Sequence, residues 1–227
     1  MPNRIRLADP AIASLLRSED YRQRDTLCLI ASENHATAAV REAMASRLGN
    51  RYSEGYPGKR FYEGQQVVDQ IEETAISRAM SLFDAEHANV QPYSGSPANL
   101  AVYAALLQPG DTVLAMDLAG GGHLTHGSPA SVTGKWFKAS HYGSDPVTGQ
   151  VDPAELERLA LQHRPKLIIA GFSAWPRQLD WSLFRKMADK VGAHLMVDMA
   201  HFAGLVAGRA VDSPVPFADV VTSTTHK

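Results

Sequence analysis

The sequence predicts an α/β fold in which a mainly parallel sheet is flanked by helices. Short apolar runs alternate with segments in which apolar residues recur at helical spacing. Runs such as 167–170 are apolar at every position, which is typical of strands that are covered on both faces. Polar residues follow several of these runs, and ligands bind at the carboxyl ends of the strands in such sheets. A chain of 227 residues can form one large domain or two small ones.

The first quarter of the chain predicts two helices and a loop. Asp9 is suited to cap a helix whose first position is Pro10, and we expect this helix to run to about residue 24. A brief apolar run follows at 27–31, and apolar residues recur at helical spacing over 40–48. Residues 49–64 hold glycines and a proline among aromatic and charged residues, which indicates a loop.

From residue 65 onward, predicted helices and strands alternate. Helical spacing of apolar residues begins the series, and Asp152-Pro153 marks one later helix start. We expect helices over 65–83, 97–107, 153–163 and 181–191, and strands over 88–91, 112–116, 166–170, 194–197 and 218–222.

The composition favours a cytoplasmic protein without a nucleic-acid or membrane partner. A formal net charge of −2 gives no reason to expect a polyanionic partner, which favours clustered positive charge. The single cysteine, Cys28, cannot form an internal disulfide, and we expect it to be a small buried apolar residue. No stretch approaches the roughly 20 apolar residues of a membrane span, and the amino terminus lacks a signal-peptide core.

A carboxylate and an amine follow two of the apolar runs. Asp198 ends the run at 195–197, and Lys227 ends the hydroxyl-rich segment that follows the run at 218–221. A buried carboxylate needs a positive partner, and a protonated pyridine nitrogen is one, whereas a structural salt bridge is the alternative. A lysine amine can form a Schiff base, so the pair indicates a pyridoxal phosphate enzyme.

Two further strand-end segments fit a phosphorylated aromatic cofactor. Ser94-Gly95-Ser96 opens a helix, where backbone amides and hydroxyls make an anion site, although serine is also an ordinary helix cap. Three glycines precede His123, whose imidazole could stack on a flat ring or lie on the surface of a flexible loop.

A metal-dependent hydrolase is the rival interpretation. His123 and His126, together with Asp198 and His201, have spacings that suit metal ligands. This interpretation leaves the segment 94–96 and Lys227 without a role, and we therefore expect no metal site.

Six segments together resemble serine hydroxymethyltransferase, a pyridoxal phosphate enzyme of the aspartate-aminotransferase-like fold (fold type I). They are LIASEN at 29–34, YSEGYPGKR at 52–60, QPYSGS at 91–96, GGHLTHG at 121–127, VDMAH at 197–201 and TTHK at 224–227. The resemblance implies reversible transfer of the serine hydroxymethyl carbon to tetrahydrofolate, which gives glycine and 5,10-methylenetetrahydrofolate. It also implies a role in one-carbon metabolism and a homodimer or homotetramer.

The resemblance implies a role for each cofactor-binding position. Lys227 matches the Schiff-base lysine, Asp198 the partner of the ring nitrogen, and His123 the residue stacked on the ring. The remaining cofactor positions are Ser94, Gly95 and Ser96 around the phosphate, Ser173 and His201 near the phenolic oxygen, and Tyr62, which is donated across the dimer interface.

Further positions match residues that contact the substrates. Glu54 matches the proton-transfer carboxylate, with Tyr52 nearby, and Thr224 completes the catalytic set. The amino-acid substrate is expected near Ser32, Glu54, Tyr62, His201 and His226, and tetrahydrofolate near Leu118, Gly122, His123 and Leu124.

Some positions depart from the commonest family pattern, and so does the length. Loop 61–64 and Trp175 differ, which leaves α-methylserine hydroxymethyltransferase and threonine transaldolase or aldolase as alternatives. Family members continue beyond the lysine with a small C-terminal domain that is absent here, so we expect this piece alone to be inactive. It is then a fragment, half of a split enzyme, or a truncated non-catalytic paralogue that pairs with a full-length subunit. We divide it into an arm with the active-site loop (1–64) and an incomplete pyridoxal phosphate-binding large domain (65–227).

Overall fold

The computed structural model describes residues 3–145 and 147–227 and separates two compact units between Glu33 and Asn34. The first unit consists of helices α1 (Asn3–Ala8) and α2 (Pro10–Asp25) and the segment after them. The predicted start of α2 is confirmed, because Asp9 accepts a hydrogen bond from the Ile12 amide.

The expected burial of Cys28 is wrong. The apolar run at 27–31 forms no strand or helix, and Leu27, Cys28 and Leu29 are all exposed. The Cys28 thiol donates to Glu33 Oε2 at 2.9 Å within the same unit. The apolar run therefore did not predict burial: it belongs to no helix or strand, and its side chains stay exposed.

The second unit begins with short elements. Helix α3 (Ala38–Met44) ends earlier than predicted, and the 3₁₀ turn η1 (Arg47–Asn50) replaces its last turn. Inside the predicted loop, β1 (Gly55–Tyr56) and β2 (Lys59–Arg60) pair as an antiparallel hairpin. Gly55 has φ +96°, and a Cβ there would lie 2.3 Å from the Lys59 carbonyl oxygen, so this position requires glycine.

Helix α4 (Gln66–Phe83) follows and ends at Asp84 in the left-handed conformation. The predicted strand at 88–91 is wrong: the segment has no strand assignment, and the Gln91 side chain contacts α4 and the hairpin. None of the helices in the described residues combines the length and apolarity that a membrane crossing needs.

The predicted α/β fold with a parallel sheet is confirmed. The sheet has the order β4-β3-β5-β6-β7, and every neighbouring pair is parallel. Its strands are β3 (Thr112–Met116), β4 (Lys138–Tyr142), β5 (Leu167–Gly171), β6 (His194–Asp198) and β7 (Val220–Thr222). Strand β4 was not predicted because this edge strand is polar and only partly buried over most of its length.

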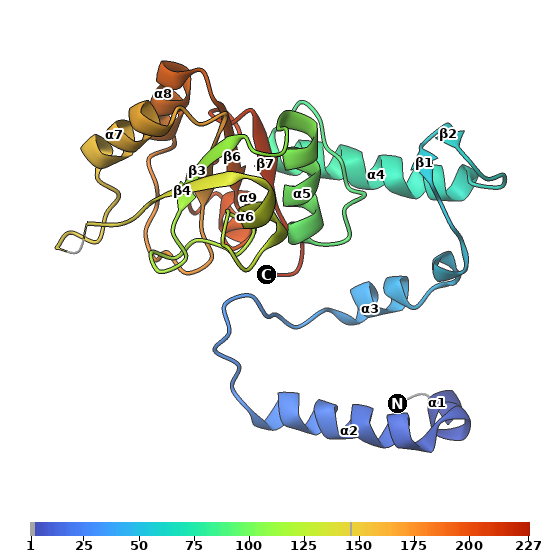
Figure 1. The fold of residues 1–227 in the computed structure, drawn as a ribbon. Helices are drawn as coiled ribbons and strands as arrows, with labels where there is room; N and C mark the ends of the chain where they lie inside the picture. Colours follow the sequence, from blue (N-terminus) through green and yellow to red (C-terminus); the bar gives the residue numbers. More distant parts are fainter. Residues whose placement is uncertain (1–2, 146) are drawn as a thin grey trace. The chain divides into compact units, whose positions relative to one another are not determined.

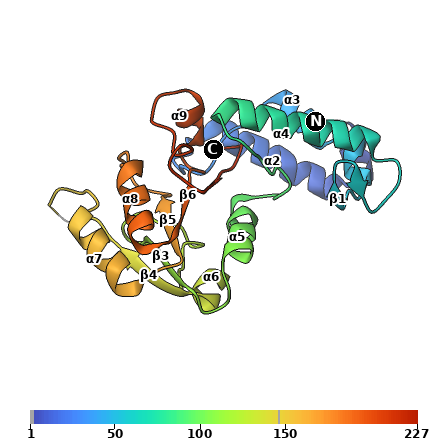
Figure 2. The ribbon, with the colours of Figure 1, turned by 90° about the horizontal axis from the view of Figure 1, so that it is seen from above.

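Helices cover both faces of the sheet. Helices α7 (Pro153–His163) and α8 (Trp181–Val191) lie on one face, and α5 (Gly95–Leu106) and α6 (Val132–Trp136) lie on the other (Figure 2). Alternate residues of each central strand enter two separate core clusters: Leu114 and Ile168 belong to one, Val113 and Ile169 to the other. Both faces of the sheet are therefore buried, as the continuous apolar runs predicted.

The strand order reverses between β3 and β5, because β4 lies on one side of β3 and β5 lies on the other. Ligands bind at such switch points, at the carboxyl ends of the strands. The loops that leave these two strands are joined there, since the Ser173 and Ala174 amides donate to the Gly121 carbonyl at 2.7 and 3.1 Å. The short helix α9 (Ala203–Ala207) follows β6.

Candidate active site

Most of the predicted cofactor positions lie at the carboxyl edge of the sheet or at the start of α5. His123 follows β3, Ser173 follows β5, Asp198 ends β6, and Lys227 follows β7. The C-terminal segment packs at the start of α5, whose first residues are Gly95 and Ser96, because Thr224 lies against Gly95. The topology thus collects residues that are more than a hundred positions apart along the chain.

Asp198 lies in the centre of a buried hydrogen-bond network. Its Oδ2 accepts from Asn99 Nδ2 at 2.9 Å and from His126 Nε2 at 3.0 Å, and its Oδ1 accepts from the Ala200 amide at 3.1 Å. Burial opposes ionisation of Asp198, but the hydrogen bonds from His126 and Asn99 outweigh it and lower the pKa to about 2. The buried side chain is therefore a carboxylate, and Oδ1 can still accept one more hydrogen bond.

The side-chain amide of Asn99 uses both of its N–H groups and its oxygen in hydrogen bonds. Its two N–H groups donate to Asp198 Oδ2 and to Thr125 Oγ1, the latter at 2.8 Å, while its Oδ1 accepts from the Thr222 hydroxyl at 2.7 Å. Asn99, Thr125 and Thr222 are all buried. One side chain on α5 thus fixes groups on β6, on β7 and in the loop after β3.

Two histidines in the loop after β3 have defined proton positions. His126 Nδ1 accepts from the His123 amide at 3.4 Å, so Nε2 carries the proton that His126 donates to Asp198. His123 Nδ1 lies 2.7 Å from Thr125 Oγ1 and accepts from the Thr125 amide at 3.2 Å. Burial, together with the neighbouring His126 and Lys227, lowers the pKa of His123, although Asp198 opposes this shift. The half-buried imidazole therefore favours its neutral form.

The start of α5 provides an anion site next to a lysine. The Ser94 side chain makes no capping hydrogen bond, so its hydroxyl and the first amides of the helix remain available to a ligand. A Cβ on Gly95 would lie 3.1 Å from Thr224 Cγ2, and Lys227 Nζ donates to Thr224 Oγ1 at 3.2 Å. A phosphate and an amine-reactive group on one ligand can therefore reach this site together.

Ser173 supplies a buried hydroxyl that finds no hydrogen-bond partner among the described residues. Such orphan groups are rare and costly, and a ligand oxygen would satisfy this one. Nearby, burial and Lys227 lower the pKa of the half-buried His201, while Asp198 opposes the shift. The remaining acceptor position on Asp198 Oδ1, the orphan hydroxyl of Ser173, the anion site and Lys227 fit the ring nitrogen, phenolic oxygen, phosphate and aldehyde of pyridoxal phosphate.

Three predicted substrate residues lie apart from this group. Tyr52, Glu54 and Tyr62 belong to the loop around the hairpin, which Figure 1 shows at the end of α4 remote from the sheet. All three are exposed, and no hydrogen bond in the described residues joins their side chains to the cofactor positions. Ser32 belongs to the first unit, and its role stays a prediction.

The predicted folate positions share one loop after β3. Leu118 and Leu124 are exposed there, whereas Gly122 is buried. A Cβ on Gly122 would lie 2.4 Å from the Met116 carbonyl oxygen, so close backbone packing explains this glycine. His226 is exposed beside Lys227.

Three residues of the rival metal set do come together. The ligand atoms of His123, His126 and Asp198 lie within 4.8 Å of one another, while His201 is not part of the group. The proton on His126 Nε2 already lies toward Asp198, and His123 Nδ1 is engaged with Thr125. These hydrogen bonds compete with a cation for the same lone pairs and favour the organic cofactor.

Sequence reasoning missed the residues that support this site. Asn99, Thr125 and Thr222 were not singled out, and His126 was considered only as a metal ligand. Asn99 follows the predicted anion segment by one helical turn, and an amide residue in that mostly apolar helix was the one available signal.

Comparison with known proteins finds one family. A family model described as serine hydroxymethyltransferase matches residues 5–227. Proteins named serine hydroxymethyltransferase are 63% identical in Coprothermobacter proteolyticus, 61% in Desulfotalea psychrophila and 60% in Cyanothece sp., each over 219 residues. These alignments cover 96% of this chain and 53%, 51% and 51% of the respective relatives. The chain thus spans about half the length of the curated relatives it matches.

Proposed function

Because this chain belongs to the serine hydroxymethyltransferase family, we propose that the protein containing it is a pyridoxal phosphate-dependent one-carbon transferase. It transfers the hydroxymethyl carbon of serine reversibly to tetrahydrofolate, which gives glycine and 5,10-methylenetetrahydrofolate. The observation that carries this proposal is the buried carboxylate of Asp198, which retains one free acceptor position at the same sheet edge as Lys227. Residues 65–227 form the cofactor-binding large domain, and residues 1–64 form the arm and active-site loop.

The chain's own residues hold the cofactor by its separate groups. Ser94, Gly95 and Ser96 bind the phosphate at the start of α5, and Lys227 binds the aldehyde carbon. Asp198 keeps the ring nitrogen protonated, which its low pKa favours because the carboxylate stays ionised. When bound, pyridoxal phosphate supplies an electron sink next to the substrate α-carbon, so that the Cα–Cβ bond of serine can break.

Further residues complete the cofactor site. His123 stacks on the ring in its neutral form, which the lowered pKa favours. Ser173 and His201 hold the phenolic oxygen, and Thr224 assists Lys227, whose amine already donates to the Thr224 hydroxyl.

Residues from the exposed loop and from other segments contact the substrates. Glu54 moves a proton between the substrate hydroxyl and tetrahydrofolate, with Tyr52 beside it. Ser32, His201 and His226 contact the amino acid, and Leu118, Gly122, His123 and Leu124 form the wall that receives tetrahydrofolate.

We propose that the protein works as a homodimer or homotetramer in the cytoplasm, where it contributes to glycine biosynthesis. The hairpin loop that carries Glu54 and Tyr62 lies apart from the C-terminus within one chain (Figure 1), which supports a shared site to which a second subunit donates the loop. Mixed dimers of Lys227→Ala and Glu54→Gln chains test this. In a shared site a 1:1 mixture regains about a quarter of wild-type activity, because about half of its dimers are mixed and each mixed dimer has one intact site of two. A mixture as inactive as its parents would contradict sharing.

The activity itself is tested with the full-length protein that carries this chain. Serine labelled at the hydroxymethyl carbon is incubated with pyridoxal phosphate and tetrahydrofolate, and the label is followed into the folate product while glycine is quantified. We expect stoichiometric transfer that the Lys227→Ala variant lacks. Faster turnover of α-methylserine or threonine, or no transfer by a cofactor-loaded protein, would contradict the proposed substrate.

A further inference from the structure

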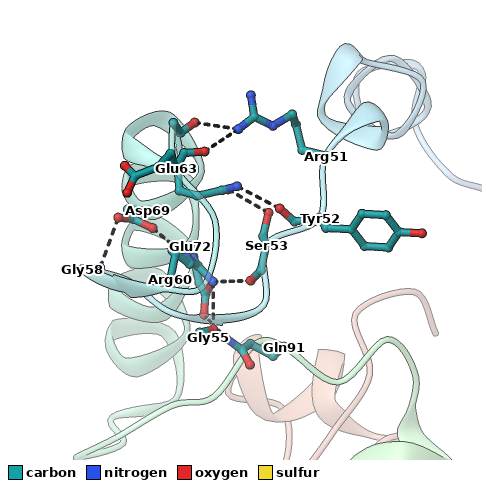
Figure 3. Close-up of polar contacts among 12 residues, drawn as sticks. Arg51, Tyr52, Ser53, Gly55, Gly58, Arg60, Glu63, Asp69, Glu72 and Gln91 are labelled. Carbon is teal, nitrogen blue, oxygen red and sulfur yellow. Dashed lines mark hydrogen bonds and ion pairs between the residues drawn. The ribbon is translucent and has the colours of Figure 1, made fainter.

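The loop that carries Glu54 is attached to α4 by a buried arginine. Figure 3 shows Arg60 directed into the space between the loop and α4. Its Nε donates to Asp69 Oδ1 at 2.8 Å, and its Nη2 donates to Glu72 Oε2 at 2.5 Å. The Arg60 side chain is only 4% exposed although the loop around it is largely exposed. Arg60, Asp69, Glu72 and Gln91 are called the Arg60 cluster below.

The third nitrogen of Arg60 holds the backbone on both sides of Glu54. Its Nη1 donates to the Ser53 carbonyl at 2.7 Å and to the Gly55 carbonyl at 2.9 Å. Gln91 Nε2 also donates to the Gly55 carbonyl at 2.9 Å, and to Glu72 Oε1 at 2.7 Å. The carbonyl groups of both neighbours of Glu54, Ser53 and Gly55, are thus fixed to the same cluster (Figure 3).

Every carbonyl from Tyr52 to Gly55 accepts a hydrogen bond. The Tyr52 carbonyl accepts from Gln65 Nε2 at 2.8 Å, and the Glu54 carbonyl accepts from the Phe61 amide at 3.1 Å. The Glu54 side chain, by contrast, is exposed and makes no hydrogen bond to any described residue. The backbone is fixed and the carboxylate is left available, which is the arrangement that a proton-transfer group on a loop needs.

We propose that Arg60 is a positioning residue that sets the place of the Glu54 carboxylate through the two flanking carbonyls. This inference rests on the proposed proton-transfer role of Glu54. Arginine suits the task because its planar guanidinium donates several hydrogen bonds at once in fixed directions, whereas a lysine ammonium cannot reach two carbonyls and two carboxylates together. Lysine at this position keeps the charge for Asp69 and Glu72 and releases the backbone around Glu54.

A double-mutant cycle with Glu54→Gln tests the inference in the full-length protein. We expect Arg60→Lys alone to lower kcat about 10- to 100-fold, because a small misplacement of a reacting group costs that much. In the Glu54→Gln background, Arg60→Lys should cost less than about threefold, since no carboxylate remains to be positioned. The affinity for pyridoxal phosphate and the oligomeric state should stay unchanged. An equal loss in both backgrounds would overturn the inference, because it indicates a merely structural role.

Two further variants complete the design. Arg158→Lys is the matched control, since Arg158 forms an exposed pair with Glu155 on α7, and it should leave kcat unchanged. Gln91 is exposed and donates to the Gly55 carbonyl, so Gln91→Leu removes one of the two donors to that carbonyl. This variant tests the positioning of Glu54 if Arg60→Lys does not fold. It should lower kcat about threefold in the wild type and not in Glu54→Gln. Full activity of Glu54→Gln would overturn the proposed role of Glu54 and this inference with it, whereas additive losses would overturn the inference alone.

Discussion

The side-chain amide of Asn99 donates a hydrogen bond of 2.9 Å to Oδ2 of Asp198, although the two residues lie 99 positions apart in the chain. Asn99 belongs to α5, whose first turn forms the anion site, and Asp198 ends β6. The same amide reaches Thr125, which contacts His123. One buried side chain therefore connects three groups that contact the cofactor in the proposed function.

Replacing Asn99 should weaken the cofactor site. Asn99→Asp removes both donors and places a second carboxylate against Asp198, and like charges at this distance raise a carboxyl pKa. We expect pyridoxal phosphate to bind about tenfold or more weakly, because a charged group loses a buried donor. Cofactor titration by absorbance checks this, with the exposed Asn50→Asp variant as control. Undiminished affinity in Asn99→Asp would contradict the connection.

Ser173→Ala should separate affinity from stability. The Ser173 hydroxyl is buried without a partner among the described residues, so its removal should change the unfolding free energy of the cofactor-free protein by less than about 1 kcal/mol. Affinity for pyridoxal phosphate should fall about three- to tenfold, because the phenolic oxygen loses its donor. Denaturant unfolding and cofactor titration measure the two quantities.

Thr222→Val is the matched control for Ser173→Ala. The Thr222 hydroxyl is also buried, but it donates to Asn99 Oδ1 at 2.7 Å. This variant should lose about 1–3 kcal/mol of stability even without cofactor. If Ser173→Ala destabilises the cofactor-free protein as much, its hydroxyl has a partner within the chain and the assignment fails.

Asp198 should make stability depend on pH in acid. Burial opposes its ionisation, but hydrogen bonds from His126 and Asn99 lower the pKa to about 2, below the usual value of 3.8. Its stabilising contribution is therefore fully present above the unfolded-state pKa and is lost as the pH falls through the folded-state pKa. From about pH 5 to about pH 2 the wild type should lose roughly 2 kcal/mol more than Asp198→Asn. Parallel unfolding curves for the two proteins across this range would argue against the low pKa.

Gly171→Ala should disrupt the edge of the sheet where the site lies. Gly171 has φ +110°, and a Cβ would lie 2.1 Å from the Asp198 carbonyl oxygen, which is backbone and cannot move aside. We expect a loss of about 3 kcal/mol or more in unfolding free energy. Gly49→Ala has open space at its Cβ and should change stability by less than about 0.5 kcal/mol. Equal thermal midpoints for the two variants would contradict the packing described here.

The elements with the strongest sequence signal were predicted well. Strand β3 and helices α7 and α8 have the predicted bounds. Their signals are local in the sequence: a continuous apolar run marks the strand, and apolar residues at helical spacing, with a capping Asp-Pro pair at the start of α7, mark the helices. Strand β4 carries no such signal, since it is an edge strand with polar residues. The segment at 88–91, where Ala88 and Val90 alternate with polar residues, was predicted as a strand but has no strand beside it to pair with in the described residues.

The site was predicted through its chemically distinctive residues and not through the residues that support them. Asp198 and Lys227 stand out at strand ends, whereas Asn99, Thr125 and Thr222 gain their meaning only when the sheet brings them together over 26 to 123 positions. Arg60 is likewise an ordinary loop arginine until its two carboxylates and two carbonyls are seen around it. A single sequence does not report such contacts.

Trapping the cofactor on its lysine tests the central claim most directly. The full-length protein is incubated with pyridoxal phosphate, reduced with borohydride, digested and mapped by mass spectrometry, with Lys227→Ala treated in parallel. We expect a stable pyridoxyl group on Lys227 and none at that peptide in the variant. A modification spread over exposed lysines such as Lys166, or an unmodified Lys227, would contradict the assignment of this sheet edge as a pyridoxal phosphate site.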